Sequence, residues 1–514
     1  VTVRFHIDGT TYTVSNVYYP DGDSQLAWVR WTTPDEPQDM TIDVDVSGPG
    51  SAQATIHCKI VDLDENPPPN PVADDRNDSF TPSPVPDRPE KTSAQWTIWD
   101  PWWQEYWVWH GDDEDGYWCD HGWWEFDLDH YSASLSADME ATLRAVRGLG
   151  VSVRLDGDAA CFSPAPPSSS PSPLPVDCGE SGSTLRFLIP LYAARGIPAV
   201  FTGHGRLPQR PLGVYADCLP PHGVTLSAAS GLPLTVTGRL TGGDFALPGD
   251  VSSQFITGLL FALPLCREDS RIRLTTPLES AGYVDMTLQV LRQAGIRVEP
   301  LEDGWFIPGS QTYRPLDTAV ESDWSQAAFL LAAGALGGEV TLTGLNPASA
   351  QGDREALSLF RRFGAAVEEA PGRIVCRKAP LHGIDIDAAQ IPDLVPVLAV
   401  TAALADGVTH ITGAARLRLK ESDRLAAVAD GIRRLGGRVE EGPDSLTITG
   451  VSRLAGGRAE GYNDHRIVMA LSMAALGCEA PVTVTDAQSV AKSWPAFFED
   501  YRAIGGTAHV IDHR

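Results

Sequence analysis

The sequence has no apolar run of the roughly 18 to 20 residues that a membrane helix needs, so we expect no transmembrane segment. Positive charge is scarce, since 39 Lys and Arg against 67 Asp and Glu give a formal net charge of −28. The summed field repels nucleic acid and anionic lipid, so we expect neither as a partner. Paired cysteine motifs are absent too. The eight cysteines have no repeating spacing, which indicates the reduced thiols of a cytoplasmic protein.

Charge and tryptophan divide the chain into two unlike parts. Residues 1–136 hold 26 acidic and 6 basic residues, a net of −20, which leaves 67 − 26 = 41 acidic and 39 − 6 = 33 basic residues, a net of −8, for the remaining 378. Eleven of the 14 tryptophans precede residue 125. At 514 residues the chain is also too long for one ordinary domain. We therefore expect a junction near residues 130–138.

The first part is predicted to contain three segments. Residues 1–65 alternate apolar and polar side chains between turns, which predicts a small antiparallel β domain. Residues 66–95 are rich in proline and predict a linker. Residues 96–136 are rich in tryptophan and acid, and these aromatic side chains either form the core of a small hairpin or bind a carbohydrate or a peptide. Their cysteine and histidines, Cys119, His110, His121 and His130, lack paired ligand spacing, so we expect no metal there.

From residue 137 onward one pattern recurs six times: an amphipathic helix that ends at a glycine and a hairpin that follows it. The glycines are 73, 72, 69, 72 and 69 residues apart, at positions 150, 223, 295, 364, 436 and 505. Glycine at a helix end fits the left-handed position after the last turn. Such regular spacing indicates an internal repeat.

Each copy also contains a helix of small residues, such as SSQFITGLLFALPL, and a further strand, which gives a βαββαβ unit in outline. Six units suggest two domains of three. The sixth copy ends after its helix and one strand, so its other half should precede residue 138. Residues 100–136 have no run of small apolar residues at helical spacing, so about half a repeat is absent or replaced.

Basic and hydroxyl side chains gather at the starts of the apolar helices or in the loops before them, each in a different repeat. Taken singly, these clusters are also explained as helix caps, surface ion pairs or solvated loops. Together they predict one cleft that binds a ligand with several negative charges. The residues are Arg186, Arg206, Arg210, Ser252, Ser253, Gln254, Lys420, Glu421, Arg424, His465 and Arg466.

These motifs resemble the 5-enolpyruvylshikimate-3-phosphate (EPSP) synthase family over residues 137–514. The resemblance rests on GESGSTLR, GRLPQRP, GDVSSQF, SAGYVDMTL, ESDWSQAAF, QGD, KESDR, YNDHR and AKSWP, which occur in the family's order. It implies the two-domain enolpyruvyl transferase fold, an inside-out α/β barrel of repeated units in the α/β (α+β) class, here preceded by the β-rich, tryptophan-rich region.

The resemblance also implies an activity and the residues that perform it. The enzyme would transfer the enolpyruvyl group of phosphoenolpyruvate to shikimate 3-phosphate and release phosphate, with no metal and no cofactor, as a cytoplasmic monomer. Shikimate 3-phosphate would be bound by Ser252, Ser253, Gln254, Ser280 and Tyr283. Lys420 would contact either the shikimate ring region or the carboxylate of phosphoenolpyruvate. Phosphoenolpyruvate would be bound by Gly182, Arg206, Arg424, Arg466 and Lys492, beside His465. Asp393, Glu421 and Lys492 would be the catalytic residues.

The sequence departs from the family at two places. Glu180 stands where many members have Asn. The leading strand and helix with a Ser-Lys-Ser motif are absent, and Lys59 and Lys91, the lysines before residue 137, have no such context. An alternative is therefore a catalytically inactive chimera of a tryptophan-rich binding module and a synthase body. The sister transferase that makes a peptidoglycan precursor is disfavoured, because its catalytic loop Cys has no counterpart in GHGRLPQRP.

Overall fold

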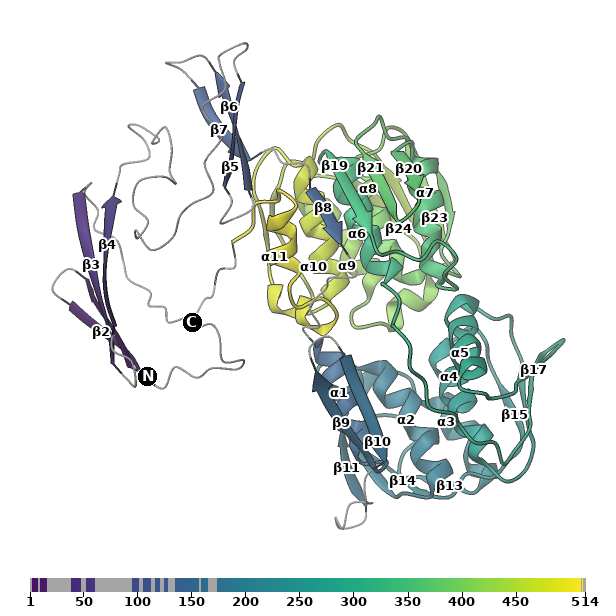
Figure 1. Cartoon of the computed structure of the whole chain (residues 1–514). Coiled ribbons are helices and arrows are strands. Elements are labelled where there is room, and N and C mark those ends of the chain that lie inside the picture. The colour runs from purple at the N-terminus through teal and green to yellow at the C-terminus, as the bar shows by residue number, and fades with distance from the viewer. Residues whose placement is uncertain are drawn as a thin grey trace. The chain divides into compact units, whose positions relative to one another are not determined.

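The computed structural model describes residues 135–156, 159–164, 173–509 and 511, together with the backbone of the strands that precede residue 128. The chain forms two compact units, Val1–Gly122 and Trp123–Arg514. The relative placement of the two units is not defined, so each is described by itself (Figure 1).

The first unit contains two antiparallel sheets. One has the order β2-β1-β3-β4, from β1 (Thr2–Ile7), β2 (Thr10–Ser15), β3 (Gln38–Ser47) and β4 (Ala52–Ile60). The other has the order β5-β6-β7, from β5 (Gln95–Asp100), β6 (Glu105–Gly111) and β7 (Gly116–Asp120). Trp96, Trp109 and Trp118 lie opposite one another across the second sheet. The candidate metal ligand His130 lies outside the described residues, as do the side chains of Cys119, His110 and His121.

The second unit is built from one repeated motif. The first complete copy is β11 (Leu174–Asp177), α2 (Gly182–Arg195), β12 (Ala199–Thr202), α3 (Gly213–Cys218) and the hairpin of β13 (Val224–Leu226) and β14 (Leu234–Gly238). Its sheet has the order β11-β12-β14-β13. The neighbouring strands β11 and β12 are parallel, and α2 connects them in the sequence. The order is therefore βαβαββ and differs from the expected βαββαβ, because the helix that ends at the repeat glycine directly precedes the hairpin.

Two further copies have the same order. One is β15 (Gly243–Leu247), α4 (Ser253–Ala262), β16 (Ser270–Leu274), α5 (Ala281–Gln293), β17 (Glu299–Leu301) and β18 (Gly304–Ile307). The other is β22 (Asp385–Asp387), α8 (Val395–Ala402), β23 (Val408–Thr412), α9 (Arg424–Arg434), β24 (Arg438–Glu441) and β25 (Leu446–Thr449). All six repeat glycines have positive φ, between 77° at Gly295 and 102° at Gly364, as their place at helix ends predicts.

Three copies are incomplete in the described residues. The first has only α1 (Ala137–Arg147) and the hairpin of β9 (Val151–Asp156) and β10 (Ala159–Pro164), which forms a sheet of two strands. The fourth has α6 (Trp324–Leu336), β19 (Glu339–Thr343), α7 (Ala356–Phe363), β20 (Ala366–Ala370) and β21 (Arg373–Arg377). The sixth has β26 (Gly457–Ala459), α10 (His465–Ala474), β27 (Val482–Val484) and α11 (Phe497–Ala503), with no further strand described.

The fourth copy takes its fourth strand from far away in the sequence. β8 (Trp124–Asp127) pairs in parallel with β19, from Val340 opposite Trp124 to Thr343 opposite Asp127. In each complete copy the sheet neighbour at this position is the strand that precedes the buried helix of the same copy: β11 beside β12, β15 beside β16 and β22 beside β23. The end of the tryptophan-rich segment therefore completes a sheet of the second unit.

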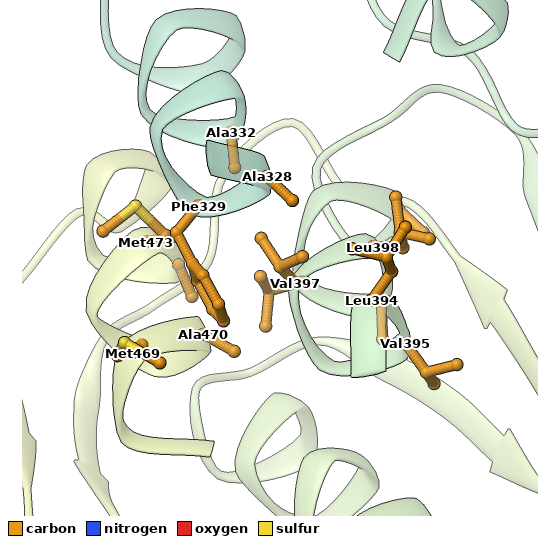
Figure 2. Close-up of a cluster of buried hydrophobic side chains, with 14 of the residues drawn as sticks. Ala328, Phe329, Ala332, Leu394, Val395, Val397, Leu398, Met469, Ala470 and Met473 are labelled. Atoms are coloured by element: carbon orange, nitrogen blue, oxygen red, sulfur yellow. The ribbon is translucent and has the colours of Figure 1, made fainter. Parts of the chain in front are cut away.

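The copies group into two lobes, each with its own core (Figure 1). In the lobe of residues 323–511, helices α6, α8 and α10 pack against one another through small side chains and a few large ones, such as Ala328, Val397, Met473 and Phe329 (Figure 2). In the lobe of residues 135–310, α2 and α4 pack together. Gly258 allows that approach, because a Cβ there would collide with the Tyr215 hydroxyl and the Arg186 carbonyl. No helix of the described residues is long and apolar enough to cross a membrane.

Candidate active site

A cavity of about 390 Å³ lies where the two lobes meet. One lobe contributes residues of α2, α4 and α5 and of the loops before α3, α4 and α5, and the other contributes Asp393, Arg416, Leu419 and Lys420. Its polar lining includes Arg186, Arg210, Ser252, Ser253, Gln254, Ser280, Tyr283, Asp393, Arg416 and Lys420. The cavity therefore brings together predicted site residues from three repeats.

The hydroxyl residues lie at helix starts. The Ser252 hydroxyl caps α4 and accepts the Gln254 backbone N–H at 3.4 Å, so the capping explanation holds for this residue. Ser280, before α5, has left-handed backbone angles (φ 55°, ψ 46°), and its hydroxyl accepts a hydrogen bond from the Arg416 guanidinium. Both serines lie at the cavity wall. A capping serine can thus also face a ligand.

Asp393 is surrounded by donors. Its carboxylate accepts from Lys420 Nζ at 3.1 Å and from Arg424 at 2.8 Å, and the Tyr283 hydroxyl donates to it at 3.2 Å. Burial alone would raise the pKa of this carboxyl, but Lys420, Arg466 and Arg424 hold the pKa well below its usual range. Asp393 is therefore an ionised carboxylate that reaches the cavity.

Arg424 is almost fully buried and joins three carboxylates. It donates to Asp464 at 2.8 Å, to Glu421 at 2.5 Å and to Asp393 at 2.8 Å. Burial would lower the pKa of this guanidinium, but Asp464, Glu421 and Asp393 raise it. Arg210 of the other lobe pairs with Glu421 at 3.3 Å. The cost of burying the guanidinium groups of Arg424, Arg210 and Arg466 is offset because each has a carboxylate beside it.

Lys492 and Glu180 connect the two lobes. The Lys492 ammonium donates to Glu180 at 3.0 Å and to the Asn463 carbonyl at 2.5 Å. The Asn463 side-chain amide donates to both Glu180 oxygens at 3.2 Å. Glu180, the residue that departs from the family pattern, thus neutralises a buried cation in this structure.

The structure separates the two arginines of the loop GHGRLPQRP. Arg206 is exposed and does not line the cavity, whereas Arg210, four residues later, is 7% exposed and does. The Arg210 guanidinium lies against Gly182, where a Cβ would come within 2.5 to 2.9 Å of its atoms. Arg210, rather than Arg206, is therefore the loop arginine at the site, and Gly182 gives it room.

His465 and Arg466 begin α10, where the Asp464 carboxylate caps the helix by accepting the Arg466 backbone N–H at 3.0 Å. Burial lowers the pKa of His465 to about 4, so the imidazole is neutral at pH 7. The Arg466 guanidinium donates to the Ser325 hydroxyl at 3.0 Å and lies 3.6 Å from the Asp393 carboxylate. Arg466 and Asp393 are therefore adjacent, as the prediction of one cleft requires.

This cluster also contains Arg186, which the sequence placed among the candidate anion ligands, and three residues that were not named from the sequence. Arg186 donates to Gln254 at 2.7 Å, and Arg416 pairs with Glu279 at 2.8 Å. The Tyr283 hydroxyl donates to Asp353 at 2.7 Å. Burial, followed by the nearby Glu421, raises the pKa of Asp138 to about 6. Arg186 and Asp353 lie in the quoted motifs, whereas Asp138 and Arg416 have no distinguishing sequence signal.

The described residues contain no group of three or more His, Cys, Asp or Glu side chains arranged to hold a metal ion. Their six cysteines are free thiols, and four of these are buried. Burial raises the pKa of Cys218, on the helix that follows the arginine loop, to about 12. Cys218 therefore remains a protonated thiol on α3.

Repeated α/β units that direct helix starts and cations from two lobes toward one cavity define a protein that binds a small anionic ligand between its lobes. Residues 132–501 match the EPSP synthase (3-phosphoshikimate 1-carboxyvinyltransferase) family, and the chain belongs to that family. Residues 1–62 and 66–146 match two families that are described as domains of unknown function, DUF8194 and DUF8195.

Individual relatives agree with this assignment. The 3-phosphoshikimate 1-carboxyvinyltransferase of Clostridium kluyveri is 44% identical over 384 residues, which cover 73% of this chain and 88% of the relative. That of Clostridium acetobutylicum is 47% identical over 337 residues, 65% of this chain and 78% of the relative. The solved structure of EPSP synthase from Acinetobacter baumannii has 29% identity and a TM-score of 0.59, and covers 73% of this chain and 88% of that one.

Proposed function

We propose that the chain transfers the enolpyruvyl group of phosphoenolpyruvate to a hydroxyl of shikimate 3-phosphate and releases phosphate. The observation that carries this proposal is the convergence of Arg210, Arg424, Arg466 and Lys492 on the side of the interlobe site where Asp393 lies. A ligand with phosphate and carboxylate groups needs such a set of cations. Membership of the EPSP synthase family selects this reaction among those that use anionic ligands.

In this proposal shikimate 3-phosphate binds against the cavity wall that α4 and α5 form. Ser252 and Ser253 offer hydroxyls at the start of α4, where the N-terminal end of a helix favours a phosphate. Gln254, Ser280 and Tyr283 add polar contacts along the same wall. Lys420 lies opposite, beside Asp393.

Phosphoenolpyruvate binds on the side of the site where Arg210 and Lys492 lie. Arg210 and Lys492 come from opposite lobes, and each is paired with a carboxylate, Glu421 and Glu180. A phosphate carries more charge than either carboxylate, so it competes for these cations. Arg210 takes the role that the resemblance gave to Arg206, because Arg210 is buried beside Glu421 whereas Arg206 is exposed.

The carboxylates supply the proton transfers. Asp393 accepts the proton of the attacking hydroxyl as its oxygen bonds to C2 of phosphoenolpyruvate, while Glu421 and Lys492 deliver a proton to C3. The Glu421–Lys492 pair then takes a proton back from C3 as the bond between C2 and the phosphate oxygen breaks and the double bond re-forms, and Asp393 gives its proton to the departing phosphate. Each carboxylate returns to its starting state, so the cycle needs no metal or cofactor. The cations stabilise the charge on the leaving phosphate.

We also propose a monomeric cytoplasmic protein. The free thiols of Cys178, Cys218, Cys266 and Cys376, all buried, support a reducing compartment. A monomer rests on the resemblance to the family. Sedimentation of the purified chain would measure its mass, and a dimer would contradict the proposal.

The test of the proposed reaction is phosphate release by the purified chain. We expect release only when shikimate 3-phosphate and phosphoenolpyruvate are both present, and calorimetry should show that shikimate 3-phosphate binds on its own. Release that does not depend on shikimate 3-phosphate would contradict the transfer. Binding of shikimate 3-phosphate with no release under any condition would favour the inactive chimera.

A further inference from the structure

Among the described residues, the lobe of residues 135–310 has one buried helix fewer than its partner lobe. In the lobe of residues 323–511, α6, α8 and α10 contact one another around a shared core. In the lobe of residues 135–310, α2 and α4 contact each other, and no third helix of this kind is described. Each complete copy places this helix between two parallel strands. The first copy, which has only α1 and the β9–β10 hairpin, is where the third helix is lacking.

The β9–β10 hairpin has an apolar face that the described residues cover only in part, since Val151 and Val153 on β9 are half-buried. Every described residue of β10 is exposed, including Phe162 at 58%, and Leu155 on β9 is 48% exposed. In the other hairpins the corresponding second strands, β14, β18, β21 and β25, each bury two or three residues. The residues on the apolar face, read from the register, are Val151, Val153, Leu155, Ala160, Phe162 and Pro164.

The β10 strand also has a free edge at a defined place. In four sheets the strand after the buried helix pairs antiparallel with the second hairpin strand: β12 with β14, β16 with β18, β19 with β21, and β23 with β25. In the first copy the second hairpin strand is β10, which pairs only with β9 among the described strands. An unpaired edge of this kind accepts an added strand through backbone hydrogen bonds.

The cavity lies beside a second surface that the missing helix would contact, in addition to the apolar face of the β9–β10 hairpin and the free edge of β10. Its apolar wall is formed by Phe187 on α2, Phe261 on α4 and Val290 on α5, and Val290 is 46% exposed. The Nε atoms of Arg186 and Arg210 are buried without a hydrogen-bond partner among the described residues, although these side chains are 2% and 7% exposed. Buried donors of this kind normally have a partner, so the cavity side of the missing element should supply acceptors.

The connection between β8 and α1 is too short to contain this element. Only nine residues, 128–136, connect the end of β8 at Asp127 with the start of α1 at Ala137. The shortest buried helix of this kind, α8, has eight residues, and the shortest strand that follows one, β27, has three. Those eleven residues and their turns exceed the nine available. A second copy of the chain has the same gap.

We propose that the lobe of residues 135–310 is completed by a separate polypeptide. Its chemistry follows from the surface: a helix of small and branched apolar residues that packs on α2, α4 and the apolar face of the hairpin, and then a strand that adds antiparallel to β10. The start of its helix faces the cavity and offers oxygen acceptors to Arg186 and Arg210. The docking stands on the geometry alone, whereas its effect on turnover rests on the proposed function.

The test uses the full chain and a labelled synthetic peptide. The peptide carries the leading strand, the Ser-Lys-Ser helix and the following strand of the family, taken from the Clostridium kluyveri relative. Fluorescence anisotropy should show saturable binding, and a scrambled peptide of the same composition should not bind. Phe162→Glu should weaken binding about tenfold or more, because it places a charge on the docking face. The matched control is Cys161→Glu, on the opposite face of the same exposed strand, which should bind like the wild type.

Three results would overturn the proposal: no saturable binding, equal binding of the scrambled peptide, or equal loss in Phe162→Glu and Cys161→Glu. A dimer of the chain that Phe162→Glu dissociates would assign the face to a second copy instead. The turnover measurement separates the two proposals. Bound peptide should raise phosphate release about a hundredfold. Bound peptide without release would leave the docking intact and contradict the enolpyruvyl transfer, whereas equal turnover with and without peptide would contradict the need for a partner.

Discussion

At the scale of single residues, the site is a set of buried charges that satisfy one another across the two lobes. Arg424 has three carboxylate partners, and Lys492 has Glu180. Removing one member of such a group leaves another buried charge without a partner, which costs more than the ion pair itself contributes. Substitutions here therefore change both ligand binding and the packing between the lobes.

Lys492→Ala should lower the rate of phosphate release about 10² to 10³-fold, because it removes the cation that the proposed reaction places at the leaving phosphate and that pairs with Glu180. The rate is measured with both substrates under the conditions that give the wild type its highest activity. Lys378→Ala, at an exposed lysine on the same lobe, serves as the control and should keep the wild-type rate. Wild-type turnover in Lys492→Ala would remove Lys492 from the mechanism.

Asp138 should make the protein less stable as the pH rises. Burial, together with the nearby Glu421, raises its pKa from 3.8 to about 6 in the folded state. Between these values the unfolded chain loses the proton while the folded chain keeps it, so the free energy of unfolding falls with rising pH and stays reduced above pH 6. Asp138→Asn should therefore stabilise the protein by about 1 to 2 kcal/mol at pH 7.5 and have little effect at pH 4.

Urea unfolding of the wild type and of Asp138→Asn at pH 4, 6 and 7.5 measures this dependence. The partly solvated position of Asp138 is the reason for the modest magnitude. Asp177→Asn, at an exposed aspartate of the same lobe, should show no such pattern. A stability difference between wild type and Asp138→Asn that does not change with pH would contradict the assignment of the raised pKa to Asp138.

At the scale of elements, sequence spacing predicted much of the repeat, and the structure decided how its strands pair. The glycine intervals identified six copies, and each glycine has the left-handed backbone that a helix end favours. The small-residue helices lie in the core, as Ala328 and Ala470 illustrate (Figure 2). The order of strands within a copy was predicted incorrectly, because alternation shows that a segment is a strand but not which neighbour it pairs with.

Gly258→Ala should destabilise the lobe of residues 135–310 by about 1 to 3 kcal/mol, since its added methyl group would push α4 away from α2. The higher helix propensity of alanine offsets only about 1 kcal/mol of this. Urea unfolding measures the change. Gly213→Ala is the matched control, because a Cβ at Gly213 meets no atom within 4 Å. Equal stabilities of these two variants would contradict the close helix packing.

At the scale of the whole molecule, β8 belongs to the second unit although its sequence resembles the tryptophan-rich segment of the first. The boundary between the compact units lies after Gly122, earlier than the junction expected from composition near residues 130–138. β8 lies between these two boundaries, and four of its residues pair with residues of β19. The synthase-like body therefore begins before its characteristic sequence does.

Two truncated chains test this boundary. A chain of residues 123–514 should fold and keep the melting temperature of the second unit, because it retains β8. A chain of residues 128–514 should melt several degrees lower, since loss of β8 makes β19 an edge strand. Calorimetry of both truncations beside the full chain gives the comparison. Equal melting temperatures of the truncations would show that the pairing of β8 with β19 adds no stability.

The sequence by itself determined the repeat, the helix ends and the chemical types at the site, because these depend on local patterns and on motifs that survive in order. Only the tertiary structure decided that Arg210 rather than Arg206 lines the cavity, that Glu180 pairs with Lys492, and that β8 completes the sheet of β19. Two of these features bring together residues that are more than two hundred positions apart, and the third distinguishes two arginines on the same loop. Such contacts are set by the packing of the two lobes, which no local pattern encodes.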